Sequence, residues 1–234
     1  MKKIHRFFTP FSQNGNNIKI DDYSIIKQIK EVLKLKTGEQ CVIIHNNLNV
    51  YAEITKITKE SIELQFIKNE PILEPEKQIT LYMAILKKEN FELVTQKVSE
   101  LGIHTIVPII TDRTVKTGLR YDRLEKIAKE ASELSGYGTF PHILEALELE
   151  QALAKDTNTV KLFFDISGED VEHIMETNTV LENKKRSIYI GPEGGFTERE
   201  ITLAKNNNCK ITKIDNFTLR GETAAIIACY MAKK

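Results

Sequence analysis

One feature of this 234-residue chain constrains its fold more than any other: after residue 78, strand-like and helix-like segments alternate regularly. Short apolar runs typical of β-strands are separated by stretches whose apolar residues recur on one helix face. Val160–Asp165 and Ser187–Ile190 are almost continuously apolar, as expected for strands covered on both sides. The alternation predicts an α/β domain with a mostly parallel sheet. The predicted strands are 79–86, 103–110, 160–165, 187–190 and 210–214.

Helix boundaries in this region carry their own signals. Asn90 is expected to cap the first helix and Gly102 to end it. Thr197 and Glu200 have the spacing of a capping box, in which each side chain bonds the other residue's backbone N–H. The predicted helices are 91–101, 121–134, 197–207 and 222–232.

The first 70 residues have a different pattern, with short strand-like runs separated by turn residues, which favours a small barrel. The segment 24–35 fits one amphipathic helix, with apolar residues at 25, 26, 29, 32 and 33. Two prolines and several charges in Asn69–Lys77 oppose both a helix and a central strand. We therefore predict a barrel domain at 1–70, a linker at 71–77 and an α/β domain at 78–234. The predicted barrel strands are 40–45, 50–57 and 61–67.

The overall charge does not indicate a class of binding partner, because 33 basic residues balance 33 acidic ones. Residues 1–36 nevertheless hold eight Lys and Arg against three Asp and Glu. This local excess fits either a phosphate-binding surface or an ordinary lysine-rich, solvated one. The three cysteines lack a CxxC pair and the five histidines lack metal-ligand spacing, so no metal site is predicted. No apolar run approaches a membrane span and no signal peptide is recognised, so we expect a cytoplasmic protein.

A glycine-rich corner follows the predicted strand 187–190. In Gly191–Phe196, Pro192 stiffens the turn, while Gly194 and Gly195 permit positive φ and let a ligand approach the backbone. The following helix presents free N–H groups, and ligands of α/β sheets commonly bind at such strand ends. A tight turn without a ligand explains the same residues equally well.

A second corner, Leu219–Ala224, places Arg220 and Glu222 on either side of a glycine just before an apolar helix. Purely structural roles exist for both residues, since Glu222 favours the positive end of the helix dipole and Arg220 can pair with it. Two such corners, separated by one helix and one strand, are nevertheless expected to face the same crevice.

These corners carry a resemblance to a known family. Together with other segments along nearly the whole chain, they resemble the motifs of the bacterial ribosomal RNA small-subunit methyltransferase E family, part of the SPOUT superfamily. Departures occur at Leu134 and Tyr137, where the family has Gln and Arg, and at Lys34, which replaces an arginine. The segments that carry the resemblance are His5–Phe8, Val32–Glu39, Gln96–Gly102, Pro108, Asp112–Val115, Ile188–Phe196 and Leu219–Ala224.

The resemblance implies a fold and a function. The fold is an N-terminal PUA-like β-barrel and a C-terminal SPOUT α/β domain with a trefoil knot, usually as a homodimer. The function is methylation of N3 of a uridine in 16S rRNA of the small ribosomal subunit, with S-adenosylmethionine as donor. Three alternatives stay open: an enzyme acting on another RNA such as tRNA, a non-catalytic RNA-binding assembly protein, and a nucleotide- or phosphate-binding enzyme. The last lacks any phosphate-binding loop.

The site residues follow from the same hypothesis. Arg220 is expected to orient the target base or stabilise its developing negative charge, and Glu222 to hold Arg220 in place. Asp165 is expected to line the crevice, and no proton acceptor is assigned. The residues expected to bind RNA are His5, Arg6, Lys30 and Lys34. The residues expected to bind the cofactor are Phe164, Ile190, Gly191, Glu193, Gly194, Gly195, Leu219 and Thr223.

Overall fold

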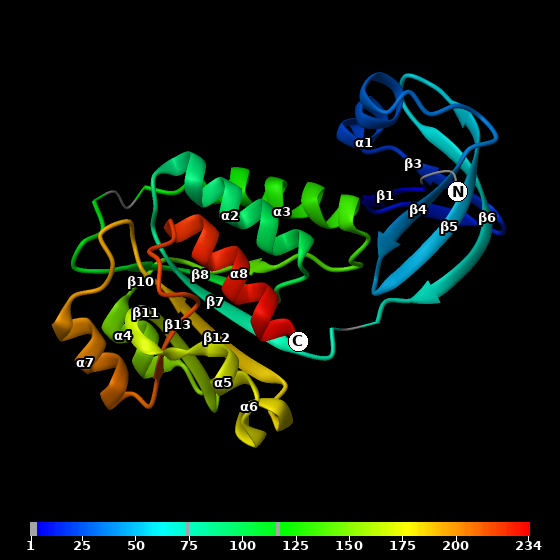
Figure 1. Ribbon diagram of the computed structural model, residues 1–234. Coiled ribbons are helices and arrows are strands. Elements are labelled where there is room, and N and C mark those ends of the chain that lie inside the picture. Colours follow the sequence, from blue (N-terminus) through cyan, green and yellow to red (C-terminus); the bar gives the residue numbers. More distant parts are fainter. Residues whose placement is uncertain (1–3, 74, 116–117) are drawn as a thin grey trace. The chain divides into compact units, whose positions relative to one another are not determined.

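The computed structural model describes residues 4–73, 75–115 and 118–234, with the side chains of 178 and 179 left aside. The chain divides into two compact units, each described here by itself. The N-terminal unit comprises the part before residue 75 together with Ser132–Thr139, and the C-terminal unit comprises the remainder (Figure 1). The division falls inside the segment 71–77 that the sequence marks as a linker.

The N-terminal unit is built on a six-stranded sheet with the order β1-β4-β5-β6-β3-β2. Its strand pairs are antiparallel except for β1 and β4, which run parallel. In the described part of the chain, no pairing joins the end strands β1 and β2, so a closed barrel stays a prediction. The strands are β1 His5–Phe8, β2 Ser12–Asn14, β3 Asn17–Ile20, β4 Gln40–His45, β5 Leu48–Ile57 and β6 Ile62–Pro71.

The helix expected at 24–35 is shorter and less regular than predicted. It consists of α1, Tyr23–Lys27, followed directly by a π-helical turn, η1, Gln28–Val32. The buried face carries Ile25, Ile26 and Ile29, as the spacing predicted. Val32 was expected on that face but is exposed, because the wider π turn rotates it away from the core.

β6 also corrects the sequence interpretation, because it continues through Asn69 and Glu70 to Pro71, all paired with β5. The proline is tolerated here because the pairing of β6 with β3 stops at Gln65. Beyond that residue one side of β6 is an edge, where no partner needs the missing N–H.

The C-terminal unit contains a fully parallel seven-stranded sheet, in agreement with the sequence prediction. The strand order is β10-β8-β7-β12-β11-β13, with β9 paired to β8. The strands are β7 Gln78–Ala84, β8 Thr105–Ile110, β9 His142–Ile143, β10 Leu147–Glu148, β11 Val160–Asp170, β12 Lys185–Ile190 and β13 Lys210–Lys213.

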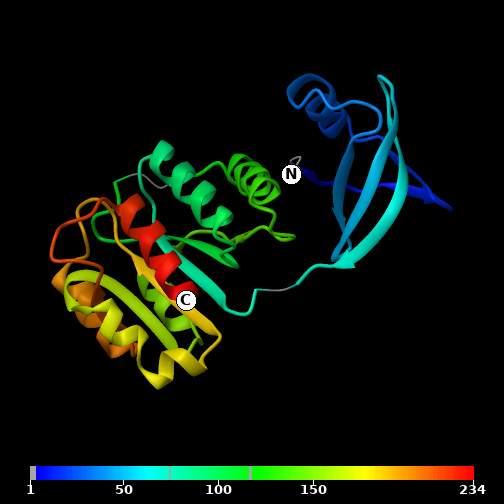
Figure 2. The same cartoon turned by 45° about the vertical axis from the view of Figure 1, so that its right-hand side comes forward.

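Helices cover both faces of this sheet, and two hydrophobic clusters lie between the layers. One cluster packs residues of α2, α3 and α8 against the sheet, and the other packs residues of α4 and α7 against the opposite face. Figures 1 and 2 show these layers from two directions. The helices are α2 Lys88–Glu100, α3 Tyr121–Ser135, α4 Leu149–Lys155, α5 Val171–Met175, α6 Asn178–Glu182, α7 Glu198–Asn206 and α8 Gly221–Lys233.

Helix ends confirm two local predictions and correct a third. Gly102 follows α2 with φ +72°, and the capping box of Thr197 and Glu200 is complete. Asn90 does not cap α2, because the helix already begins at Lys88 and its preceding residue makes no side-chain cap bond. The described helices include none with both the length and the apolar character needed to cross a lipid bilayer.

β11 is longer than predicted because it continues past the expected end at Asp165. Its pairing with β13 shifts register between Phe164 and Glu169. At Gly168 the two strands approach so closely that a Cβ atom would lie 2.4 Å from the backbone nitrogen of Thr212. A glycine is therefore required at this point, where the backbones of the paired strands β11 and β13 come closest.

Candidate functional site

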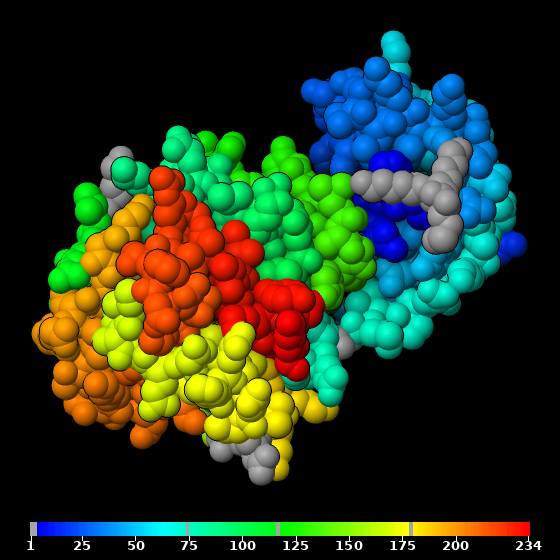
Figure 3. Space-filling model, viewed as in Figure 1, coloured from blue at the N-terminus to red at the C-terminus, as the bar shows by residue number. Residues whose placement is uncertain are grey.

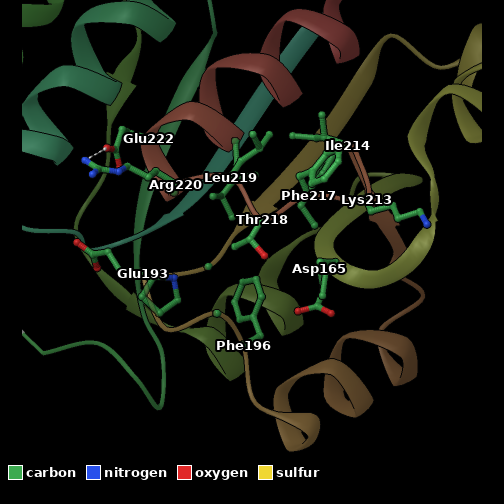
Figure 4. A pocket seen from close by; sticks show the side chains of 18 of the residues that line it. Asp165, Glu193, Phe196, Lys213, Ile214, Phe217, Thr218, Leu219, Arg220 and Glu222 are labelled. Atoms are coloured by element: carbon green, nitrogen blue, oxygen red, sulfur yellow. Dashed lines mark ion pairs between the residues drawn. The ribbon is translucent and has the colours of Figure 1, made fainter.

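A cavity of about 560 Å³ opens at the carboxyl ends of β7, β11, β12 and β13. Both glycine corners line it, the first through Gly191 and the second through Gly221. Figure 4 shows Glu193 and Phe196 of the first corner and Leu219 and Arg220 of the second around the cavity. The segment that leads into α8, drawn orange to red, lies at the surface of this unit (Figure 3). Ligands of open α/β sheets commonly bind at this place, outside the carboxyl ends of the strands.

The two corners touch each other directly. A Cβ atom on Gly221 would lie 3.4 Å from the carbonyl oxygen of Gly191, and one on Gly191 would lie 3.0 Å from the ring of Phe196. The strands that lead to the corners are not neighbours, since β11 lies between β12 and β13. The corners meet because α8 returns from the sheet edge to pack on β12 and β7.

Positive φ occurs at one of the two central glycines. Gly195 has φ +69°, so of the two glycines that permit positive φ, Gly195 is the one that uses this freedom. The carbonyl oxygen of Gly194 instead accepts a hydrogen bond of 2.5 Å from Arg113 Nη1. The backbone oxygen of Gly194 is therefore part of a set of hydrogen bonds, called here the brace, that joins the glycine corner to Arg113 and its loop.

That brace holds the glycine corner against the loop after β8. Arg113 also donates to the Phe196 carbonyl at 3.4 Å, and the backbone N–H of Asp112 donates to Glu200 Oε1 at 2.8 Å. Arg199 Nη2 donates to Asp112 Oδ1 at 2.7 Å. This hydrogen bond, supported by the hydroxyl of Thr197, lowers the pKa of Asp112. The loop and the N-terminus of α7 are therefore locked into one arrangement.

Six of the eight residues expected to bind the cofactor line the cavity: Phe164, Ile190, Gly191, Glu193, Gly195 and Leu219. Asp165 lines it as well. Gly194 and Thr223 lie outside this lining and are exposed. Two strand residues, Phe164 and Ile190, and four residues of the following loops thus meet at one cavity, and their part in binding a cofactor stays a prediction.

Arg220 and Glu222 both line the cavity but differ in their surroundings. The side chain of Arg220 is 86% exposed, whereas Glu222 is buried. Arg220 Nη1 lies 3.9 Å from Glu222 Oε1, a long ion pair that leaves the guanidinium free to contact a ligand. Glu222 Oε2 is buried without a hydrogen-bond partner. A buried carboxylate oxygen without a donor is ready to accept one from a bound molecule.

Charged side chains lie on both sides of the cavity. Glu193, Arg220 and Glu222 lie on one side, and Lys213 and Asp165 lie on the other (Figure 4). Figure 4 shows Phe217 and Ile214 across the cavity from Glu222 and Arg220. Phe217 is 78% exposed and lines the cavity, so its ring is accessible to a molecule bound there. Further residues of the lining that sequence reasoning missed are Lys87, Asn90, Phe196 and Lys213.

No local signal identifies most of these residues, because they reach the cavity only through the fold. Phe196 is different, since it falls in the segment Ile188–Phe196 that carries the family resemblance. Arg113, which does not line the cavity but bonds the glycine corner, falls in the segment Asp112–Val115 that carries the same resemblance. Asparagine is a common N-cap residue, but the helix begins earlier than predicted and places Asn90 in its first turn, where it lines the cavity.

The four residues expected to bind RNA lie in the N-terminal unit. His5 and Arg6 are half-buried on β1. Lys30 is exposed on η1 and donates to the Thr58 carbonyl at 3.2 Å, while Lys34 is exposed with φ +51°. An RNA-binding role for all four stays a prediction.

In residues 4–73, 75–115 and 118–234, side chains of His, Cys, Asp and Glu nowhere form a group of three or more that could hold a metal ion.

Comparison with known proteins decides the family. The model of an RNA methyltransferase domain matches residues 73–233. Ribosomal RNA small subunit methyltransferase E of Rickettsia conorii is 30% identical over 207 residues, which cover 87% of this chain and 84% of that protein. The chain belongs to the methyltransferase E family.

Other family members agree along almost the full length. The Aquifex aeolicus protein of the same name is 24% identical over an alignment covering 95% of this chain and 96% of the relative. The crystal structure of the Neisseria gonorrhoeae methyltransferase E, bound to S-adenosyl methionine, has a TM-score of 0.86 and 25% identity. That likeness covers 97% of this chain and 96% of the other.

Proposed function

We propose that this protein transfers a methyl group from S-adenosylmethionine to N3 of a uridine in 16S rRNA. One observation carries the proposal: the two glycine corners meet around a single cavity at the carboxyl edge of the parallel sheet. Membership of the methyltransferase E family supports it, as does the S-adenosyl methionine bound in the Neisseria gonorrhoeae relative.

The cavity fits such a donor in size and chemistry. Its volume of about 560 Å³ lies within the usual range for small-molecule sites. Phe164, Ile214 and Phe217 offer apolar surface for a purine ring, and the backbone at Gly195, where a Cβ atom would meet nothing within 4 Å, is open to close approach. Glu222 Oε2, which has no hydrogen-bond partner, can accept a hydrogen bond from one of the bound reactants. When bound, the donor supplies an electrophilic methyl group on a positively charged sulfur.

The residues of this chain then position the two reactants and stabilise the negative charge that develops on the uracil ring. The braced corner around Gly195 fixes one wall of the cavity before any ligand arrives, which favours a well-oriented attack. Arg220, exposed beside Glu222 in the cavity lining, is placed to donate to a uracil carbonyl oxygen as negative charge develops on the ring. The target base must leave its stack to reach this cavity.

The remaining features are proposals of the same kind. His5, Arg6, Lys30 and Lys34 would contact RNA phosphates from a PUA-like N-terminal unit. The return of α8 from the sheet edge across the sheet is the path that a trefoil knot would need. We also propose a homodimer in the cytoplasm, which light scattering on purified protein and cell fractionation would test.

The deciding experiment measures methyl transfer from tritiated donor to 16S rRNA and to assembled small subunits, with mass spectrometry of the digested nucleosides. We expect 3-methyluridine. Arg220→Ala should lower the rate by about 10²-fold or more while the calorimetric affinity for S-adenosylhomocysteine changes little. Arg120→Ala, which removes another exposed arginine paired to an acidic residue, serves as the control.

Other outcomes would overturn the proposal. A different methylated nucleoside would exclude N3 of uridine, and methylation of tRNA alone would identify another substrate. Donor binding without transfer to any RNA would favour a non-catalytic assembly protein. Unchanged turnover in Arg220→Ala would remove that residue from the mechanism.

A further inference from the structure

Four carboxylates line the cavity, and they differ in what they already bind. Asp165 Oδ1 accepts from both the backbone N–H and the hydroxyl of Ser167, at 2.9 and 2.7 Å. Asp215 Oδ1 accepts from the backbone N–H of Asn216 at 2.5 Å. Both side chains are engaged in local turns and point no unsatisfied buried oxygen at a ligand.

The other two are glutamates, which lie on the same side of the cavity as Arg220 (Figure 4). Glu193 is exposed to solvent, and its Oε1 accepts from the backbone N–H of Lys87 at 3.5 Å. Glu222 is only 8% exposed, and its Oε2 is buried with no hydrogen-bond partner. Of the carboxylates in the described lining, Glu222 therefore combines burial with an unsatisfied oxygen.

The carboxylate that carries Glu222 Oε2 lies close to a cation in the cavity lining. Its other oxygen, Oε1, faces Arg220 at 3.9 Å, so the two side chains lie on the same side of the cavity (Figure 4). Histidine is absent from the described lining, and its lysines, Lys87 and Lys213, are hydrogen-bond donors when charged. A proton acceptor placed next to a cation that stabilises an anion is the arrangement that general base catalysis requires.

We propose that Glu222 is the general base that removes the N3 proton of the target pyrimidine, a role that rests on the proposed function. The N3–H proton moves to Glu222 Oε2. The N3 electron pair forms the new bond to the methyl carbon, the carbon–sulfur bond breaks, and its electron pair stays on sulfur as a neutral thioether. Arg220 stabilises the charge that appears on the ring oxygens.

The test varies the acidity of the N3 proton and so the extent to which its removal requires a general base. A fluorine at C5 of uridine withdraws electrons and makes the N3 proton easier to remove. Transcripts of 16S rRNA containing uridine or 5-fluorouridine are methylated by wild-type protein and by Glu222→Gln, which keeps the shape of the side chain. We expect Glu222→Gln to lose about 10²–10⁴-fold in kcat on uridine RNA. On 5-fluorouridine RNA the loss should be at least about tenfold smaller.

Two further measurements separate this role from others. The affinity for S-adenosylhomocysteine and the melting temperature of Glu222→Gln should match those of wild type. Glu130→Gln, an equivalent change on the exposed face of α3, should leave both rates unchanged. Glu222→Asp keeps a carboxylate but draws it back, so it should show a smaller loss that also shrinks on 5-fluorouridine RNA.

Equal losses on both RNAs would overturn the proposal, as would a loss confined to donor binding. If Glu222→Gln does not fold, Glu222→Asp carries the same comparison. If wild-type protein makes no 3-methyluridine, the proposed function fails before any variant is compared, so the two failures are distinguishable.

Discussion

Gly168 gives the sharpest test of the architecture around the cavity. A Cβ atom at this position would lie 2.4 to 2.6 Å from backbone atoms of Thr212 and Ile211, where ordinary van der Waals contacts are 3.4–4 Å. Backbone atoms of a paired strand cannot turn aside as a side chain can. Gly168→Ala therefore forces β11 and β13 apart by about 1 Å.

Overpacking of this kind typically costs 1–3 kcal/mol, and we expect the upper end, about 3 kcal/mol, because backbone must move. For a domain of this size that corresponds to a fall of roughly 6–12 °C in melting temperature. Lys213 and Ile214 follow Thr212 and line the cavity, so affinity for S-adenosylhomocysteine should fall as well.

Circular dichroism melting and calorimetric titration measure both effects. The control is Gly118→Ala, because a Cβ atom there meets nothing within 4 Å. If Gly168→Ala melts within about 2 °C of this control, the close approach of β11 and β13 is refuted.

Four further predictions concern other parts of the chain. Gly195→Val should weaken donor binding more than about tenfold, because φ +69° strains a β-branched residue; equal calorimetric affinity would exclude the corner from binding. Changing Lys30 and Lys34 to Glu should weaken RNA binding and flatten its salt dependence, and an unchanged slope in filter binding would contradict this. Arg186 is fully buried and donates to three carbonyl oxygens at the ends of α6 and α8, so Arg186→Met should lower the free energy of unfolding by about 3 kcal/mol in urea titrations. Burial raises the pKa of all three cysteine thiols, so native protein at pH 8 should react with Ellman's reagent far more slowly than protein in denaturant; rapid native reaction would contradict this for Cys41, Cys209 and Cys229.

Several elements were predictable because their signals are local. The periodicity of apolar residues predicted the central strands and the long helices. The capping box of Thr197 and Glu200 predicted the start of α7. The short strands β9 and β10 and the helices α4, α5 and α6 escaped prediction. They hold two to seven residues, too few for a period to emerge.

The errors also have physical causes. A π-helical turn exposed Val32, which a regular α-helix would have buried. Pro71 could remain in a strand because one side of β6 has no partner there. The first error arises from the irregular geometry of the helical segment itself, and the second from the absence of a partner strand beside Pro71.

The sequence alone determined the parallel α/β architecture, the two glycine corners and the residue types available for chemistry, since each depends on neighbours along the chain. Tertiary structure decided which of these meet. It inserted β11 between β12 and β13, returned α8 so that Gly221 touches Gly191, and buried one oxygen of Glu222 beside an exposed Arg220. Strand order and helix return depend on packing between distant segments, which no local pattern encodes.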